Sequence, residues 1–362
     1  MSLGTREPGG RGAPSTDGEG TLAALKSAYG GLYEPAFELV IGDATYRAGD
    51  GLVGDLTVDT TVVGADRFSA RFDGEFDPTT RRVSFPDLDW ADFETGTDVT
   101  VAVGYAGALV DAFVGSVSEV SADYPASGPP SVEVAGYGPL QATTHGTRTR
   151  SWDETTDGDV ASAVLDEYDF GGREVESTDV THQKVVQDAE SDYDFLRRRA
   201  RRNGFQLSCR RGTVRFAPPG YDAEPTVALR YGESLGSFSV TTTSAEQVAE
   251  VTVRHWDPAT KSEIVGSASH DGPGSGPETL RVPVDSTSEA DAVAQAVLDR
   301  IRSGLVSGRG ETVGVPDLQA GDTIQLSGLG DRFDRTYFVT RATHRLGSEG
   351  FRTDFAVEER VL

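Results

Sequence analysis

The sequence contains one cysteine (Cys209), one methionine and three lysines among its 362 residues. A single cysteine excludes an internal disulfide and any zinc site that needs several thiolates. No stretch approaches the roughly 20 apolar residues of a membrane-spanning helix. The first 20 residues also lack the apolar core of a signal peptide. We therefore expect a protein made in the cytoplasm, with no signal peptide and no transmembrane segment.

Positive charge is also scarce, with 33 basic against 58 acidic residues and a formal net charge of −25. This balance argues against sequence-specific nucleic-acid binding and against anionic membranes, since both require surplus positive charge. An acidic chain almost without lysine is typical of a salt-rich cytoplasm, where the Debye length falls to about 3 Å and carboxylates repel little. We predict a halophilic protein; the alternative is an ordinary acidic one.

The residue pattern predicts a mainly β chain with an α+β insert. Residues 1–34 are expected to form a flexible N-terminal tail and a short helix, since the tail is rich in Gly, Pro and Ser. Residues 35–148 alternate polar and apolar side chains between turn signals, which indicates an antiparallel β-barrel. Residues 149–240 contain helical spacing at 157–168 and 191–203, and are expected to form an α/β insert domain. Residues 241–362 are expected to form a second barrel that includes a helix at 288–303.

No motif in the sequence predicts a catalytic, cofactor or metal site. The acidic run 153–159 resembles a calcium loop, but Val164 stands where the bidentate Glu would be required. The five histidines are scattered, and neither a G-x-S-x-G turn nor a phosphate-binding P-loop occurs. The arginine cluster 197–202 could bind nucleic acid or an acidic partner. In so acidic a chain, the pattern favours a solvated, ion-paired helix face or a protein contact.

Three stretches carry a family resemblance. They are Gln187–Phe205 (QDAESDYDFLRRRARRNGF), Val248–Lys261 (VAEVTVRHWDPATK), and the closing segments GVPDLQAGD, GLGDRF, YFVTRATH and GFRTDF between 314 and 355. In this order and spacing they resemble the phage late-control D family, the baseplate hub proteins of contractile tails and contractile injection systems, and the hub portion of VgrG-like spike proteins. The resemblance covers about residues 35–362.

The resemblance implies a structural protein rather than an enzyme, without a cofactor. It implies two tail-tube-like β-barrels that flank a small α/β domain, and a homotrimer that adapts a six-fold inner tube to a three-fold spike around a central channel. The implied partners are further copies of the chain, the inner tube protein, a separate spike protein and other baseplate components. The finished particle would be a phage tail or an extracellular injection device.

The residues in these motifs have structural chemistry, and we expect them to form the framework or its interfaces. Ser191 is placed to cap a helix that Gly204 ends, with Phe195 and Leu196 facing a sheet. Trp256, Asp257 and Pro258 read as a strand exit, with the ring covering a barrel end. The remaining candidates are Gly321, Gly328, Phe333 and His344.

A weak internal echo agrees with two related barrels, although chance could also produce it. Phe93, Gly96, Val99, Val101 and Gly104 recur as Leu318, Gly321, Ile324, Leu326 and Gly328 at nearly the same offsets. Two other functions remain open. A β-barrel hydrolase would need carboxylates or a Ser/His pair that converge in a cleft, and a cell-wall-binding module would need an exposed aromatic groove on residues 150–235.

Overall fold

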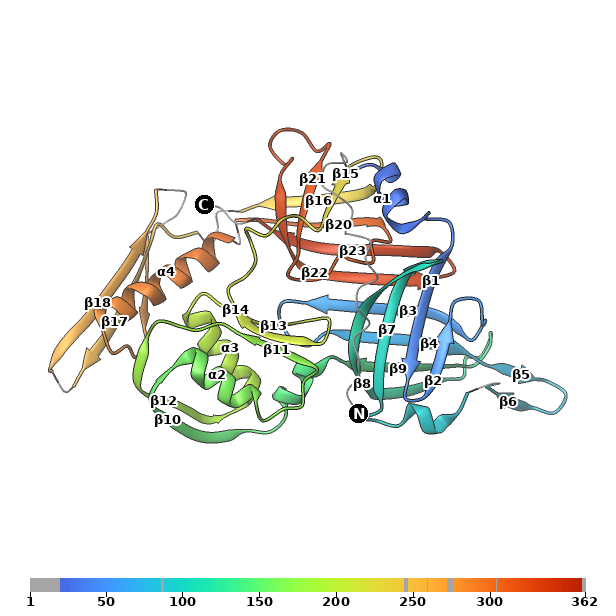
Figure 1. Ribbon diagram of the computed structural model, residues 1–362, viewed down its shortest axis with the longest axis horizontal. Coiled ribbons are helices and arrows are strands. Elements are labelled where there is room, and N and C mark those ends of the chain that lie inside the picture. Colours follow the sequence, from blue (N-terminus) through green and yellow to red (C-terminus); the bar gives the residue numbers. More distant parts are fainter. Residues whose placement is uncertain are drawn as a thin grey trace.

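The computed structural model describes residues 20–85, 88–243, 247–258, 260–271, 276–303 and 305–359. Most of the predicted N-terminal tail therefore lies outside the described residues. The chain forms two β halves, an α/β insert and a peripheral layer around the helix α4 (Thr287–Ser303) (Figure 1). None of the described helices is long and apolar enough to cross a membrane.

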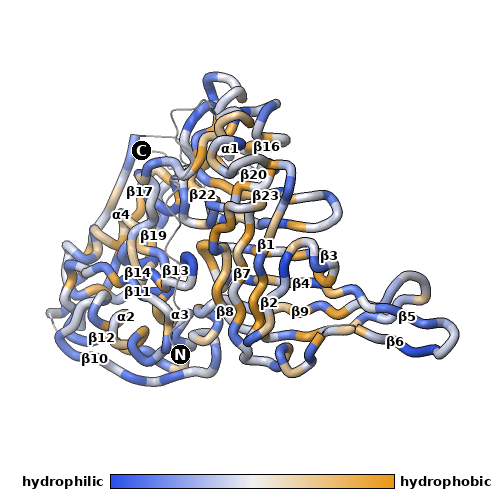
Figure 2. Tube along the Cα trace, turned by 45° about the vertical axis from the view of Figure 1, so that its right-hand side comes forward, coloured by the Kyte–Doolittle hydropathy of each residue, from blue (hydrophilic) through white to orange (hydrophobic). Residues whose placement is uncertain are grey.

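The first half holds most of the N-terminal strands. It contains β1 (Pro35–Ile41), β2 (Ala44–Arg47), β3 (Val53–Thr61), β4 (Arg67–Asp73), β7 (Asp98–Tyr105), β8 (Ala108–Asp123) and β9 (Ser131–Tyr137). The helix α1 (Leu22–Tyr29) precedes it, and the short 3₁₀ helices η1 (Trp90–Phe93) and η2 (Pro139–Thr144) lie at its ends. A separate hairpin, β5 (Glu75–Asp77) with β6 (Arg82–Ser84), projects from the body (Figure 2). Every second side chain along β4 is buried, at Phe68, Ala70 and Phe72. Because alternate side chains point to opposite faces of a strand, one face of this half lines the hydrophobic core.

The second half is built from strands that lie far apart in the sequence. It contains β15 (Val227–Arg230), β16 (Leu235–Thr242), β20 (Val306–Val313), β21 (Thr323–Ser327), β22 (Thr336–Gly347) and β23 (Gly350–Glu358). Strand β22 also pairs with β3, from Arg341 opposite Thr61 to Leu346 opposite Leu56. The two halves therefore share one 13-stranded sheet and one continuous hydrophobic core. We call the β22–β3 pairing the seam.

The insert and the α4 layer each have a core of their own. The insert contains β10 (Arg148–Thr156), α2 (Asp157–Leu165), β11 (Gly172–Val175), β12 (Thr181–Glu190), α3 (Asp192–Arg202), β13 (Gln206–Arg210) and β14 (Thr213–Ala217). The α4 layer packs α4 on a three-stranded sheet of β17 (Glu250–Asp257), β18 (Ser262–Ser269) and β19 (Pro277–Arg281). The prediction of a mainly β chain with an α+β insert is confirmed.

Two boundaries differ from the sequence-based expectation. Strands β15 and β16 fall within the expected insert, 149–240, but pair with β21 and β20 of the second half. The helix expected within the second barrel, 288–303, packs instead on the sheet of the α4 layer. Both differences arise because non-local strand pairing, which local periodicity does not report, decides which layer a segment joins.

The two halves repeat the same strand order. The first half reads β3-β4-β9-β8-β7, and the second reads β16-β20-β23-β22-β21, with every neighbouring pair antiparallel. The irregularities match as well. Strand β8 shifts register against β9 between Val117 and Glu119, and β22 shifts against β23 between Val339 and Arg341.

The sequence echo falls on this structural repeat. Gly96 and Gly321 both adopt positive φ, at 94° and 90°. The Gly96 N–H donates to the Val117 carbonyl, whose own N–H donates to the Thr97 carbonyl. In the second half the Gly321 N–H donates to the Val339 carbonyl, and the Val339 N–H donates to the Asp322 carbonyl. Identical strand order, bulge position and hydrogen bonds make the two halves a structural duplication.

Candidate functional site

Helix α3 carries the first group of predicted residues, and the structure gives each the expected place. Ser191 is the N-cap, and its hydroxyl accepts from the Asp194 N–H at 3.1 Å. Phe195 and Leu196 are fully buried in the insert core, where the Phe195 ring stacks on Trp152 at 5.5 Å. Gly204 follows the helix with φ +69°. The local signals in the sequence therefore placed this helix to within one residue.

The arginines of α3 divide between three environments. Arg198 pairs with Glu190 at the surface. Arg199 pairs with the buried Asp157 inside the insert, and Arg202 pairs with the buried Glu289 of the α4 layer. The remaining two, Arg197 and Arg201, line a pocket between α3 and α4. The ion-paired face expected from the sequence accounts for only part of the cluster.

A buried charge cluster joins the insert to the α4 layer at Asp157 and His182. Asp157 is 1% exposed and contacts Arg199, the His182 ring and the Asn203 amide, the last at 2.7 Å. Burial alone would raise the pKa of Asp157, but these contacts together hold it below its usual range. His182 Nε2 lies 2.8 Å from Arg199 Nη2 and 3.3 Å from Asp157 Oδ2, so the imidazole contacts both members of this ion pair.

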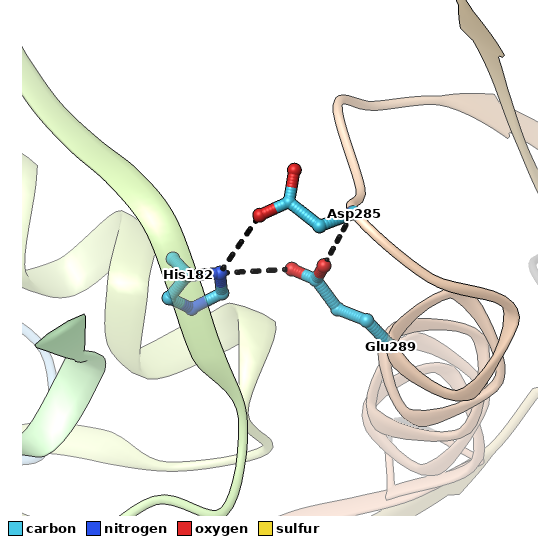
Figure 3. Close-up of side chains that lie close together, drawn as sticks. All are labelled: His182, Asp285 and Glu289. Carbon is cyan, nitrogen blue, oxygen red and sulfur yellow. Dashed lines mark hydrogen bonds and ion pairs between the residues drawn. The ribbon is translucent and has the colours of Figure 1, made fainter. Parts of the chain in front are cut away.

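The Nδ1 side of His182 faces two carboxylates of the α4 layer (Figure 3). Glu289 Oε1 lies 3.4 Å from Nδ1 and Asp285 Oδ2 lies 3.9 Å away. Glu289 is 2% exposed, and its Oε2 accepts from the Asp285 N–H at 2.7 Å at the start of α4. Residues from the insert and from the α4 layer therefore meet in a single buried network.

Donor atoms of His182, Asp285 and Glu289 approach one another closely enough to hold one cation. The guanidinium of Arg202, however, already binds Glu289 Oε1, the oxygen that faces the imidazole. A cation there would compete with that guanidinium and lie close to a second, Arg199. The arrangement therefore suits an ionic lock between two modules better than a metal centre. Because Glu289 and Asp157 are buried and paired, they also do not form an open pair of catalytic carboxylates.

Sequence reasoning did not identify this cluster. Its members come from segments about 100 residues apart, so no spacing rule could find them. One local signal was available, because Ser286 and Glu289 form the S-x-x-E pattern of a helix N-terminus, and the Glu289 N–H does donate to Ser286 Oγ at 3.1 Å.

The Trp256, Asp257 and Pro258 motif lies elsewhere than expected. Trp256 is 60% exposed at the end of β17, and Pro258 lies in the turn that follows. Asp257 accepts from the Thr260 hydroxyl at 2.6 Å, which shapes that turn. The motif is a strand exit, as predicted, but it belongs to the α4 layer. The Trp256 ring therefore does not cover a barrel end.

The last predicted residues lie in the second half. Gly321 and Gly328 take positive φ at the two ends of β21, and Phe333 is half-buried in the turn before β22. His344 is fully buried on β22. The predicted residues thus occupy three separate places, at α3, at the β17 turn and around β21 and β22, rather than one site.

His344 organises a polar chain inside the second half. The Leu318 carbonyl only accepts, so His344 Nε2–H donates to it at 3.0 Å. In the neutral ring Nδ1 then accepts from the Thr353 hydroxyl at 3.0 Å, and Thr353 Oγ1 in turn accepts from the Val315 N–H at 3.0 Å. Burial lowers the pKa of His344 to about 4, because the apolar surroundings disfavour the charged ring. This histidine is a neutral core residue.

Two sheet edges form the best candidate assembly surface. Beyond Val117, β8 pairs only with β9, and β16 pairs only with β20, among the residues that the structure describes. The free part of β8 includes Val120, 37% exposed, and Tyr124, 62% exposed, follows it. An exposed strand edge with apolar side chains is a ready template for pairing with a strand of another chain.

An aromatic groove of the kind that binds glycans is not evident on the insert. Trp152 stacks on Phe195, and Tyr168 stacks on Phe170. Tyr231 is the one exposed aromatic side chain among the described residues of 150–235.

Comparison with known proteins gives a family and a fold. Residues 72–277, more than half of the chain, match the family described as the Alg8 N-terminal domain. The chain belongs to this family. The match to the Alg8 N-terminal domain runs from β4 through the complete insert to the start of β19. No curated protein matches the chain by sequence.

Solved structures share the fold over most of their length. The 43 kDa tail protein of prophage MuSo2 from Shewanella oneidensis has a TM-score of 0.73 at 13% identity, covering 90% of this chain and 99% of its own. A tail protein from Neisseria meningitidis has a TM-score of 0.70 at 15% identity, covering 90% and 97%. An Escherichia coli component of the type VI secretion system, described as similar to T4 tail proteins gp27 and gp5, has a TM-score of 0.55 at 12% identity, covering 86% and 74%. The chain therefore has the fold of these tail proteins.

Proposed function

We propose that the protein is a structural baseplate hub of a contractile phage tail or extracellular injection system. It would act as a homotrimer that joins a six-fold inner tube to a three-fold spike around a central channel. The structural duplication carries this proposal, since three copies of a chain with two equivalent halves present six similar units. The fold shared with tail proteins supports the same conclusion.

The seam suggests how such a ring closes. Within the chain, β22 of the second half pairs with β3 of the first half. In the duplication, β8 is the counterpart of β22 and β16 is the counterpart of β3. Among the described residues, β16 has one unpaired edge, and β8 has an unpaired edge beyond Val117. Such a contact joins two different surfaces of neighbouring copies, and it closes into a ring when the rotation from one copy to the next divides a full turn evenly. The free β8 edge of one copy would pair with the free β16 edge of the next.

The duplication also predicts the register of this contact. Glu119 corresponds to Arg341 through the matching bulges, and Thr241 corresponds to Asp59 through the matching pairs of β16 and β3. Because Thr343 faces Asp59 in the seam, Ser121 is expected to face Thr241 of the next copy. Ala122 would then face Val240.

Engineered disulfides test both the ring and its register. We expect a trimeric mass by light scattering in molar salt, and covalent trimers when Ser121→Cys is combined with Thr241→Cys, or Ala122→Cys with Val240→Cys. Neighbouring pairs alternate in geometry, so one of the two should oxidise readily. Ser121→Cys with Ser237→Cys is the control, since it lies about 13 Å out of register. The native Cys209 is buried and should not form a disulfide with the introduced cysteines.

The results separate the role from the contact. A monomer at every salt concentration would contradict the hub proposal. A trimer that forms disulfides only in the control variant would be consistent with the hub proposal but would refute the register proposed for the contact between β8 and β16. If the halophile prediction holds, lowering the salt should dissociate the trimer, because the carboxylates are then screened less and repel one another over a longer distance.

A further inference from the structure

The pocket between α3, α4 and the second half has an unusual lining for so acidic a protein. It has a volume of about 810 Å³ and receives residues from the insert, the α4 layer and the main sheet. Arg197 and Arg201 of α3 and Arg300 of α4 line it. Across the described residues, none of the three has a carboxylate within ion-pair distance, in a chain with a net charge of −25.

The three arginines concentrate positive charge at one place. Partial burial, and then the charges of Arg197 and Arg300, lower the pKa of Arg201. Three carboxylates, on Asp222, Asp299 and Glu358, also line the pocket, and each of them has an interaction partner. Asp299 accepts from the Gln295 amide at 2.9 Å, and Glu358 accepts from the Tyr221 hydroxyl at 2.8 Å. The lining therefore keeps uncompensated donors directed at an occupant.

This charge is not a consequence of the repeated fold. The first half has a pocket of about 610 Å³ at the corresponding place, since Ser118 and Tyr137 there match Thr340 and Glu358. That pocket is lined by four carboxylates, on Glu38, Asp98, Asp111 and Asp169, and by a single arginine, Arg211. Of two pockets at equivalent positions, only the one in the second half is rich in arginine.

We propose that the arginine-lined pocket binds a carboxylate-bearing segment of a partner protein, with apolar residues beside the acidic ones. Guanidinium groups bind carboxylates with two parallel hydrogen bonds, which makes arginine suited to this recognition. The apolar part of the lining, including Val63 (54% exposed), Phe205 and Pro219, suits the side chains of a peptide. A nucleic acid fits less well, because its closely spaced phosphates would meet the acidic remainder of the surface.

This inference does not depend on the trimer, because all the residues that carry it belong to one chain. An occupant would contact the insert, the α4 layer and the main sheet at once. The partner would therefore hold three modules in a fixed relation, in addition to the ionic lock at His182.

Selection from a random peptide display library on the full chain tests the proposal. We expect the enriched peptides to contain Asp or Glu next to apolar residues. Fluorescence anisotropy then measures an enriched peptide on the wild type and on the Arg197→Gln, Arg201→Gln, Arg300→Gln variant. We expect each lost arginine to weaken binding about tenfold, as for other charge-assisted pairs.

A matched control separates the pocket from general charge. Arg82→Gln with Arg309→Gln removes two exposed arginines on β6 and β20, and should leave the affinity unchanged. Equal unfolding midpoints would show that the variants are folded. The proposal is overturned if no acidic peptide is enriched, or if the triple variant binds as well as the wild type. Competition with a single-stranded oligonucleotide or with inorganic phosphate gives a further test. The proposal is also overturned if either compound displaces the peptide at a concentration as low as the peptide's own dissociation constant.

Discussion

Strands β8 and β22 occupy matching places in the two halves, yet one is covered and the other is bare. Ala342 and Leu346 of β22 are 0% and 5% exposed, because β3 pairs alongside them. Their counterparts, Val120 on β8 and Tyr124 directly after it, are 37% and 62% exposed. The two strands occupy equivalent positions, but only β22 has a neighbouring strand along this edge. This difference supports the proposal that the β8 edge is an interface for a second chain.

The largest expected effect comes from placing a charge on each strand in turn. Ala342→Arg buries an unpaired charge in the seam and should destabilise the folded chain by about 4 kcal/mol. Val120→Arg places the same charge on the free edge and should leave the unfolding midpoint of the monomer unchanged, while trimers no longer form. Urea unfolding and light scattering measure the two effects. If both variants lost stability equally, the β8 edge would already be buried within one chain.

Local signals predicted the helices well because they act within a few residues. Ser191 and Gly204 mark both ends of α3, and the apolar spacing of residues 288–303 located α4. The assignment of these elements to layers could not be predicted in the same way. Strand β16 joins β20 across more than 60 residues, and β17 leaves the barrel because α4 covers its sheet. The local periodicity of the sequence does not show which sheet either strand joins.

The candidate sites show the same limit. The arginines of α3 are conspicuous in the sequence, but nothing there separates Arg199, which meets Asp157, from Arg201, which lines the pocket. Their roles follow from where α2 and α4 lie relative to α3. The echo around Gly96 and Gly321 was visible in the sequence, and paired strands were needed to establish it as a duplication.

The next effect is a difference in pH dependence, since the first half buries the acidic side chain of Asp66 and the second half buries the basic side chain of His344. Burial raises the pKa of Asp66 to about 7 in the first half and lowers the pKa of His344 to about 4 in the second. Between pH 7 and 4, acidification therefore stabilises the fold through Asp66, whose folded pKa lies above its unfolded value. It destabilises the fold through His344, whose folded pKa lies below its unfolded value. Each contributes about 3 kcal/mol at most, since one pKa unit corresponds to about 1.4 kcal/mol.

Substitution should separate the two contributions. His344→Gln is expected to reduce the loss of stability on acidification. Asp66→Asn keeps an oxygen for the Thr61 N–H, which donates to Asp66 at 3.0 Å, and should raise stability at pH 7 while steepening the loss toward pH 4. Urea midpoints across this range provide the measurement. Identical pH profiles for the two variants would contradict the opposite signs.

The smallest expected effect tests the equivalence of the halves most directly. A Cβ at Gly96 or Gly321 would meet no heavy atom within 4 Å, so only the left-handed backbone opposes it. Gly96→Ala and Gly321→Ala should therefore each cost about 1 kcal/mol, with equal shifts in the urea midpoint. Gly107→Ala is the control for a positive-φ turn outside the repeated hydrogen bonds, and it should cost a similar amount. A much larger cost at Gly96 or Gly321 than at Gly107 would mean that the paired bonds to Val117 and Val339 constrain these turns more tightly than backbone preference alone. Unequal costs at Gly96 and Gly321 would mean that the two halves, although built alike, are no longer held alike.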